Sequence, residues 1–304
     1  MGAIAKRVIL FLAVNLLVML ALGVVLVVAQ SFFPALRQGY GSLIFMGSLF
    51  GFGGAILGLF LSKWSAKRGL GVQVIDPATA SGEERWLLQT VYRLAKDAGI
   101  ESMPEVGIWE SPEINAFCTG PTKNSSLVAV STGILRTMNH DELEGVLGHE
   151  LSHASNGDMV TMTLIQGVVN SFVLIASMII TNALRGDRDN DRGFSGFMMR
   201  QLVFSAVQTV LGLLAFIVVV GPFSRLREYR ADAGGAKLTT KAKMIGGLQA
   251  LLDQQRIPMP AQAQGPRDPS LATLMVNGGP SAWFSTHPKL EDRIARLKAM
   301  TTVR

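Results

Sequence analysis

Four uncharged, apolar runs constrain the fold of this 304-residue chain more than any other feature of its sequence. They cover residues 8–29, 41–62, 159–184 and 201–221. A helix of about 20 apolar residues is long enough to cross the hydrocarbon core of a bilayer. Charged residues make up only 16% of the chain, well below the roughly 25% of soluble domains. We therefore predict four transmembrane helices. The last two runs hold more polar residues. The alternative for them is a pair of helices that pack against protein and do not cross the membrane.

The first run has a second interpretation, because a basic start followed by an apolar stretch also characterises a cleaved signal peptide. Lys6 and Arg7 would form that basic start. The run is longer than the apolar part of a usual signal peptide, and a second run follows it closely. We therefore expect a retained helix.

Basic residues beside the runs predict the orientation in the membrane. They are Lys6, Arg7, Lys63, Lys67, Arg68, Arg225, Arg227 and Arg230. Short flanks rich in Lys and Arg face the cytoplasm, so we expect both ends of each pair of helices there. The arginines of residues 185–200 make that segment an imperfect outside loop. The net charge of +6 then reflects attraction to anionic lipid headgroups, and we expect no nucleic-acid partner. The single cysteine, Cys118, fits a reducing compartment.

Two segments outside the runs have the composition of soluble structure. Residues 63–158 combine a helical pattern with three short extended stretches, which predict a small sheet. These stretches are 105–109, 114–119 and 127–131. Residues 223–304 have mainly helical patterns. Within them, residues 255–281 are rich in Pro, Gly, Ala and Gln, and we interpret them as a mobile loop or lid, with a plain linker as the alternative.

The segment His149-Glu150-Leu151-Ser152-His153 is an H-E-x-x-H motif. Residues four apart share one face of a helix, so both imidazoles can reach a single ion. Glu150 follows His149 directly and is near enough to act as a general base on a water at that ion. The motif therefore predicts a metal-dependent hydrolase.

The local sequence agrees with a helix at this motif. Asn139 can cap its start, with Glu142 three residues later as in a capping box. Gly145 and Gly148 are expected to leave the metal side open for substrate. The alternative is a chance match on an ordinary amphipathic helix. Two of the chain's four histidines fall in the motif, which argues against chance.

A carboxylate is the expected third ligand. Catalytic zinc sites have three protein ligands and an open position, and no histidine stands where the longer H-E-x-x-H-x-x-G-x-x-H pattern would place it. Glu228 would bind the metal, and Asp232, four residues later, would accept the free N–H of a ligand histidine. Two runs separate His153 from Glu228, so the chain returns to the same side of the membrane. The alternative is that both acids are solvated among nearby arginines.

The sequence resembles the HtpX family of bacterial heat-shock metalloproteases, which is related to the CAAX prenyl proteases. The resemblance extends over essentially the whole chain. It is carried by Asn115-Ala116-Phe117, Val130-Ser131-Thr132-Gly133, His149 to Asp158, Ser224-Arg225-Leu226-Arg227-Glu228-Tyr229, Ala231-Asp232 and Ser285-Thr286-His287-Pro288.

This resemblance implies a zinc endopeptidase with one Zn²⁺ per chain and Glu228 as the third ligand. It also implies that His287 stabilises the oxyanion and that Asn115 binds substrate backbone or the oxyanion. Their alternatives are structural: His287 begins the last helix, and Asn115 lies in a turn. The family's role implies misfolded membrane proteins as substrates, contact with other membrane quality-control proteases, and the bacterial inner membrane as the location.

We therefore expect a mainly α fold with a small β-sheet, an α+β zincin-like catalytic domain with four transmembrane helices. The expected parts are a transmembrane hairpin at 1–62, a cytoplasmic catalytic part at 63–158, a second hairpin at 159–222 and a second catalytic part at 223–304. Two other functions stay open. One is a narrow-specificity processing protease of the CAAX type. The other is a zinc transporter or sensor, although transporters place polar ligands inside their spans.

Overall fold

The computed structural model describes residues 27–28, 31–32, 39–184, 194–255 and 287–301. The predicted first span and the Pro-rich segment 255–281 lie almost entirely outside these residues. The chain divides into two compact units. We call Met1–Gly58 with Met162–Pro222 the helical unit, and Leu59–Thr161 with Phe223–Arg304 the α/β unit. Each unit is built from two segments that are distant in sequence.

Three described segments are long and apolar enough to cross a membrane: Ile44–Gly69, Asp158–Ala183 and Gly196–Leu238. They belong to helices α2 (Gly39–Gly69), α6 (Asp158–Leu184), α7 (Phe194–Ala215) and α8 (Gly221–Leu238). Between 6% and 28% of their most apolar stretches is buried within the protein, so most of this apolar surface is free to face lipid. The last three predicted runs therefore coincide with candidate spans.

The last candidate span continues beyond the predicted end at residue 221. A π-helical turn, η2 (Phe216–Val220), joins α7 to α8, and Pro222 lies in the first turn of α8. Proline has no N–H to donate and its ring crowds the preceding turn, and a π-turn changes the hydrogen-bonding pattern at that point. The proline therefore changes the helix type without ending the helix.

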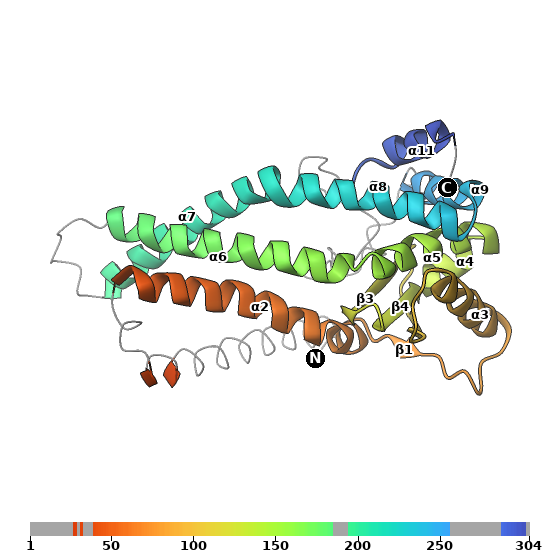
Figure 1. The fold of residues 1–304 in the computed structure, drawn as a ribbon, viewed down its shortest axis with the longest axis horizontal. Helices are drawn as coiled ribbons and strands as arrows, with labels where there is room; N and C mark the ends of the chain where they lie inside the picture. Colours follow the sequence, from red (N-terminus) through yellow and green to blue (C-terminus); the bar gives the residue numbers. More distant parts are fainter. Residues whose placement is uncertain (1–26, 29–30, 33–38, 185–193, 256–286, 302–304) are drawn as a thin grey trace. The chain divides into compact units, whose positions relative to one another are not determined.

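Glycines bring α2 close to α6 in the helical unit, where Figure 1 shows the two helices side by side. A Cβ at Gly51 would collide with the backbone and hydroxyl of Ser171, and one at Gly47 would collide with Ile175. A Cβ at Gly54 would have nothing within 4 Å. Of the repeated glycines in α2, these first two make the close approach.

Replacing Gly51 by Leu should therefore destabilise the protein by about 1–3 kcal/mol, the usual cost of overpacking. Thermal unfolding of the purified protein in detergent measures the effect. Gly54→Leu on the same helix is the matched control and should unfold near the wild-type temperature. Equal unfolding temperatures for the two variants would contradict the packing of α2 on α6.

The α/β unit contains a four-stranded mixed sheet in the order β1-β2-β4-β3. The strands are β1 (Gln73–Val74), β2 (Glu105–Trp109), β3 (Ala116–Thr122) and β4 (Ser125–Ser131). β2 and β4 are parallel, whereas β3 pairs with β4 as an antiparallel edge strand. The predicted small sheet is confirmed.

Helices cover both faces of this sheet. One face packs against α3 (Gly82–Asp97) and α5 (His140–Ser155), and α5 also packs against α9 (Lys241–Gln255). The last helix, α11 (Leu290–Ala299), packs against α9, and the short α4 (Thr132–Thr137) follows β4. The end of α2 covers the other face, where Ala66 and Leu70 join Trp109, Phe117 and Leu127 in a smaller apolar cluster. The sheet thus holds β3 directly against α5 (Figure 1).

Candidate metal centre

Helix α5 presents its two motif histidines to one point. The predicted capping box forms, because the Asn139 side chain accepts from the Glu142 N–H and the Glu142 side chain accepts from the Asn139 N–H. This cap begins the helix at His140, nine residues before His149. The Nε2 atoms of His149 and His153 lie 3.1 Å apart, and both rings are buried.

Glu228 of α8 faces both rings. Its Oε2 lies 3.3 Å from His149 Nε2 and its Oε1 lies 3.3 Å from His153 Nε2. The three side chains offer ligand atoms within 4.8 Å of one another, and Glu228 is fully buried. The structure thus brings together the three residues that the sequence analysis named as ligands.

A carboxylate lies beyond each ring, on the side away from Glu228. His149 Nδ1 lies 3.0 Å from Asp232 Oδ1, and His153 Nδ1 lies 2.6 Å from Asp158 Oδ2. A carboxylate accepts, so it keeps the ring proton on Nδ1 and leaves the Nε2 lone pair free. Each Nε2 lies 3.3 Å from an oxygen of the Glu228 carboxylate, so a metal ion can take the place of a proton between them. Two imidazoles and one carboxylate are a known ligand set of catalytic metal sites. The residues present therefore fit a metal ion.

The electrostatic surroundings of His149 also favour positive charge. Burial lowers the pKa of this ring and Arg293 lowers it further, but hydrogen bonds to Asp232 and Glu228 outweigh both and raise the pKa to about 9.

Glycines allow α8 to approach α5 closely enough for these contacts. A Cβ at Gly235 would stand 2.9 Å from the His149 backbone nitrogen, and one at Gly234 would collide with Ser152. On α5, Gly148 faces Thr239 and Gly235, and Gly145 faces the backbone of Lys243 in α9. The expectation that Gly145 and Gly148 keep a substrate channel open is therefore wrong. They serve helix packing instead.

Glu150 is held by the edge strand β3. Its Oε2 accepts a hydrogen bond from the Cys118 backbone N–H at 3.0 Å, and the side chain is 6% exposed. This contact orients a carboxylate that follows directly after the first ligand histidine.

Arg293 of α11 also belongs to this cluster, although no motif in the sequence predicts it. This side chain is fully buried and contacts Asp232 at two points, with Nε 2.9 Å from Oδ2 and Nη2 2.6 Å from Oδ1. Its Nη1 lies 3.5 Å from Glu228 Oε2. A signal was present, because Arg293 occupies an apolar-stripe position with Leu290, Ile294 and Leu297. A charge on the buried face of an amphipathic helix indicates a buried partner.

His287 and Asn115 lie in different surroundings. His287 Nδ1 lies 2.8 Å from Glu228 Oε2, so the structure brings this ring to the candidate ligands. Asn115 is buried directly before β3, and its backbone pairs with Ser131. Its N–H donates to Ser131 Oγ at 3.1 Å, and its carbonyl accepts from the Ser131 N–H at 2.9 Å.

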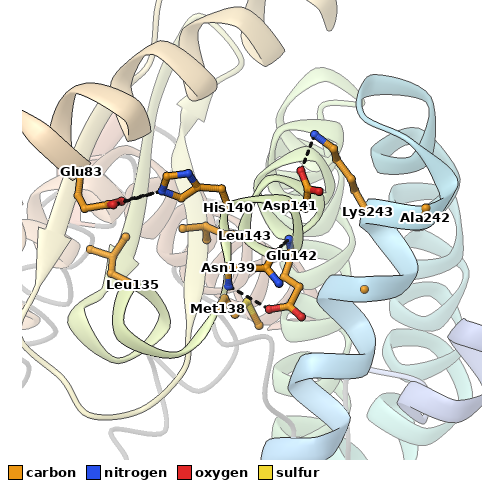
Figure 2. A pocket seen from close by; sticks show the side chains of 11 residues that line it. Glu83, Leu135, Met138, Asn139, His140, Asp141, Glu142, Leu143, Ala242 and Lys243 are labelled. Carbon is orange, nitrogen blue, oxygen red and sulfur yellow. Dashed lines mark hydrogen bonds and ion pairs between the residues drawn. The ribbon is translucent and has the colours of Figure 1, made fainter.

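A separate cavity of about 830 Å³ lies at the start of α5. Figure 2 shows two pairs among its lining side chains, His140 with Glu83 and Lys243 with Asp141. The start of α5 is about 13 Å along the helix from His149. We assign this cavity no part in the metal centre.

Comparison with known proteins decides the family. The sequence model of Peptidase family M48 matches residues 81–301, which include every residue of the centre described above. The chain belongs to peptidase family M48. Protease HtpX of Tolumonas auensis is 47% identical over 97% of this chain and 99% of its own length. Protease HtpX of Alkalilimnicola ehrlichii is 45% identical, and that of Xanthomonas oryzae pv. oryzae is 46% identical. The latter two alignments cover 96% and 97% of this chain and 97% of each relative.

A solved structure supports the same fold. The crystal structure of S. mikatae Ste24p aligns over 97% of this chain with a TM-score of 0.66 and 18% identity, and this chain covers 64% of that one. The resemblance to the HtpX proteases is thereby confirmed. Together, the M48 family, the HtpX relatives and the three apolar helices identify a membrane metalloprotease.

Proposed function

We propose that this M48 protease is a zinc endopeptidase that cleaves misfolded or damaged membrane proteins at the cytoplasmic face of the bacterial inner membrane. The observation that carries the proposal is the convergence of His149, His153 and Glu228. Their donor atoms lie within 4.8 Å of one another, Glu150 directly follows His149 in the chain, and the described residues include three candidate membrane spans.

His149 and His153 would hold the zinc ion through Nε2, and Glu228 would hold it through its carboxylate. Two nitrogens and one carboxylate match the ligand set of catalytic zinc in peptidases. Asp232 accepts the Nδ1–H of His149 and so orients that ring. Zinc bound here would polarise the scissile carbonyl and make a bound water acidic.

Glu150 acts as the general base in this proposal. Its carboxylate takes a proton from the attacking water and then passes it to the leaving amine. The Cys118 N–H holds the carboxylate in place during both transfers. Because a charged group that is already oriented loses little entropy in the reaction, this contact favours rapid proton transfer.

Asn115 and His287 complete the proposed site. In the described sheet, β3 is an edge strand, so an extended substrate can add beside it through main-chain hydrogen bonds. Asn115, which directly precedes β3, would bind substrate backbone. His287 would donate from Nε2 to the oxygen that becomes negative in the transition state, while its Nδ1 contacts Glu228.

The substrate class and the orientation are supported by the membrane helices and their flanks. The proposed division is a transmembrane hairpin at 1–62, a second at 159–222, and cytoplasmic catalytic parts at 63–158 and 223–304. The basic residues beside the spans favour the cytoplasmic side. We also propose a role in the stress response, with other membrane quality-control proteases as partners, on the basis of the resemblance to the HtpX proteases. The fold likeness to Ste24p favours CAAX-type processing as the second candidate.

The deciding experiment incubates the purified full-length protein in detergent with a destabilised membrane protein. We expect cleavage that a zinc chelator stops and added zinc restores, and little cleavage of the same substrate in its stable form. A prenylated C-terminal peptide tests the second candidate. Cleavage of that peptide alone would replace quality control with CAAX-type processing, and chelator-resistant cleavage would remove the metal from the mechanism.

Replacing Glu228 by Ala should reduce bound zinc from one per chain to a small fraction, because two imidazoles remain where three ligands are needed. Elemental analysis of the purified variant measures the loss. Glu144→Ala on α5 is the control and should keep its zinc, since Glu144 pairs with Arg93 and Lys243. Full zinc occupancy after Glu228→Ala would point to another third ligand.

A further inference from the structure

The helix that carries the metal motif is joined almost directly to a candidate membrane span. Helix α5 ends at Ser155 and α6 begins at Asp158. At the junction, Gly157 has φ +69°, a left-handed conformation that glycine adopts without steric cost. The Gly157 N–H donates to Ala154 O at 3.1 Å, and its carbonyl accepts from the Thr161 N–H at 3.1 Å. One tight turn therefore sets where α6 begins relative to α5.

The first residue of α6 contacts a candidate ligand. His153 Nδ1 and Asp158 Oδ2 are 2.6 Å apart, a distance typical of a strong, charge-assisted hydrogen bond. Asp158 is 4% exposed and His153 is 8% exposed. Burial removes competing water, so this carboxylate controls which ring nitrogen carries the proton and how the ring is turned.

We propose that Asp158 is a positioning residue that orients His153 for the metal and ties this ligand to the start of a membrane-crossing helix. The inference rests on the proposed metal site. With its proton directed to Asp158, His153 keeps Nε2 free toward Glu228, 3.3 Å away. Asp232 holds His149 in the same manner, but from α8. Each imidazole is therefore oriented by a carboxylate at or beside a different candidate span.

Zinc affinity tests the role of Asp158. The full-length protein is purified in detergent, and its zinc dissociation constant is measured by competition with a chromogenic chelator. Loss of a carboxylate that orients a ligand histidine weakens metal binding about 10- to 100-fold, and we expect this for Asp158→Ala. Asp158→Asn should lose less, because the amide oxygen can still accept from Nδ1–H. Asp141→Ala removes an exposed acid from the first turn of α5 and should bind zinc as the wild type does.

A cobalt spectrum separates positioning from general stability. Co²⁺ in place of zinc reports ligand geometry through its visible absorption bands. We expect Asp158→Ala to change these bands, and Asp141→Ala to leave them unchanged. Wild-type affinity together with an unchanged cobalt spectrum in Asp158→Ala would overturn the inference. A wild-type protein that binds no zinc would instead overturn the proposed metal site, so the two failures are distinct.

The link to α6 is tested with a pair of glycines. Gly157 and Gly99 have φ values of +69° and +70°, and a Cβ at either would meet nothing within 4 Å. Alanine should therefore strain both turns equally and lower both unfolding temperatures by similar amounts. We expect zinc binding to weaken several-fold in Gly157→Ala and to stay unchanged in Gly99→Ala, which lies at the end of α3. Equal affinities in the two variants would show that the turn does not control the ligand.

Discussion

Replacing Glu150 by Gln should lower turnover of a membrane-protein substrate by about 10²–10⁴-fold, the contribution of a general base, while one zinc ion per chain stays bound. The amide has the size of the carboxylate and can still accept from the Cys118 N–H that holds Glu150. It cannot take up a proton at neutral pH. The loss should therefore appear in kcat and leave KM nearly unchanged.

Steady-state cleavage and elemental zinc analysis on the same preparation check this result. Glu144→Gln is the matched control, because Glu144 lies on the same helix but pairs with Arg93 and Lys243. That variant should cleave at the wild-type rate. Turnover near the wild-type rate in Glu150→Gln would remove Glu150 from the mechanism.

Replacing Arg293 by Met should lower the free energy of unfolding by about 3–5 kcal/mol, the cost of leaving a buried acid without its partner. Arg293 is fully buried and forms two hydrogen bonds to Asp232, at 2.9 and 2.6 Å. Without these two hydrogen bonds, His149 is the remaining partner of Asp232 in the described cluster. We therefore expect weaker zinc binding as well as lower stability.

Thermal unfolding and chelator competition in detergent measure the two effects of this variant. Arg296→Met is the control, since Arg296 is one turn away on α11, is exposed, and lies 4.5 Å from the Tyr229 ring centroid. Such an exposed cation–π contact contributes about 0.5–1 kcal/mol. If Arg293→Met and Arg296→Met had the same unfolding temperature, the buried cluster would not depend on Arg293.

Patterns that repeat over short distances could be read from the sequence. The spacing of His149 and His153 predicts a shared helix face, and Asn139 with Glu142 predicts the cap that begins the helix. The apolar runs predict the three candidate membrane spans among the described residues. The short extended stretches predict the sheet. In each case the signal lies within one helix or strand, where backbone geometry fixes which side chains are neighbours.

The candidate third ligand depended on more than spacing. A carboxylate is expected on chemical grounds, with Glu228 as the ligand and Asp232 as the acceptor for a ligand histidine, yet two solvated acids are an equally good interpretation of their spacing. In the structure, Gly234 and Gly235 bring α8 against α5, and this approach buries both acids. Which long-range partners meet depends on such packing, which no local pattern encodes.

The sequence alone thus placed the two histidines, the glutamate between them and the apolar helices, because helix spacing and run length are properties of a single segment. Folding added the rest: Glu228 at both Nε2 atoms, Arg293 on Asp232, Asp158 on His153, and the Cys118 N–H on Glu150. These contacts join residues from different elements, most of them far apart in the chain. They form because burying a charge requires a partner in the same place, and only the packed chain brings those partners together.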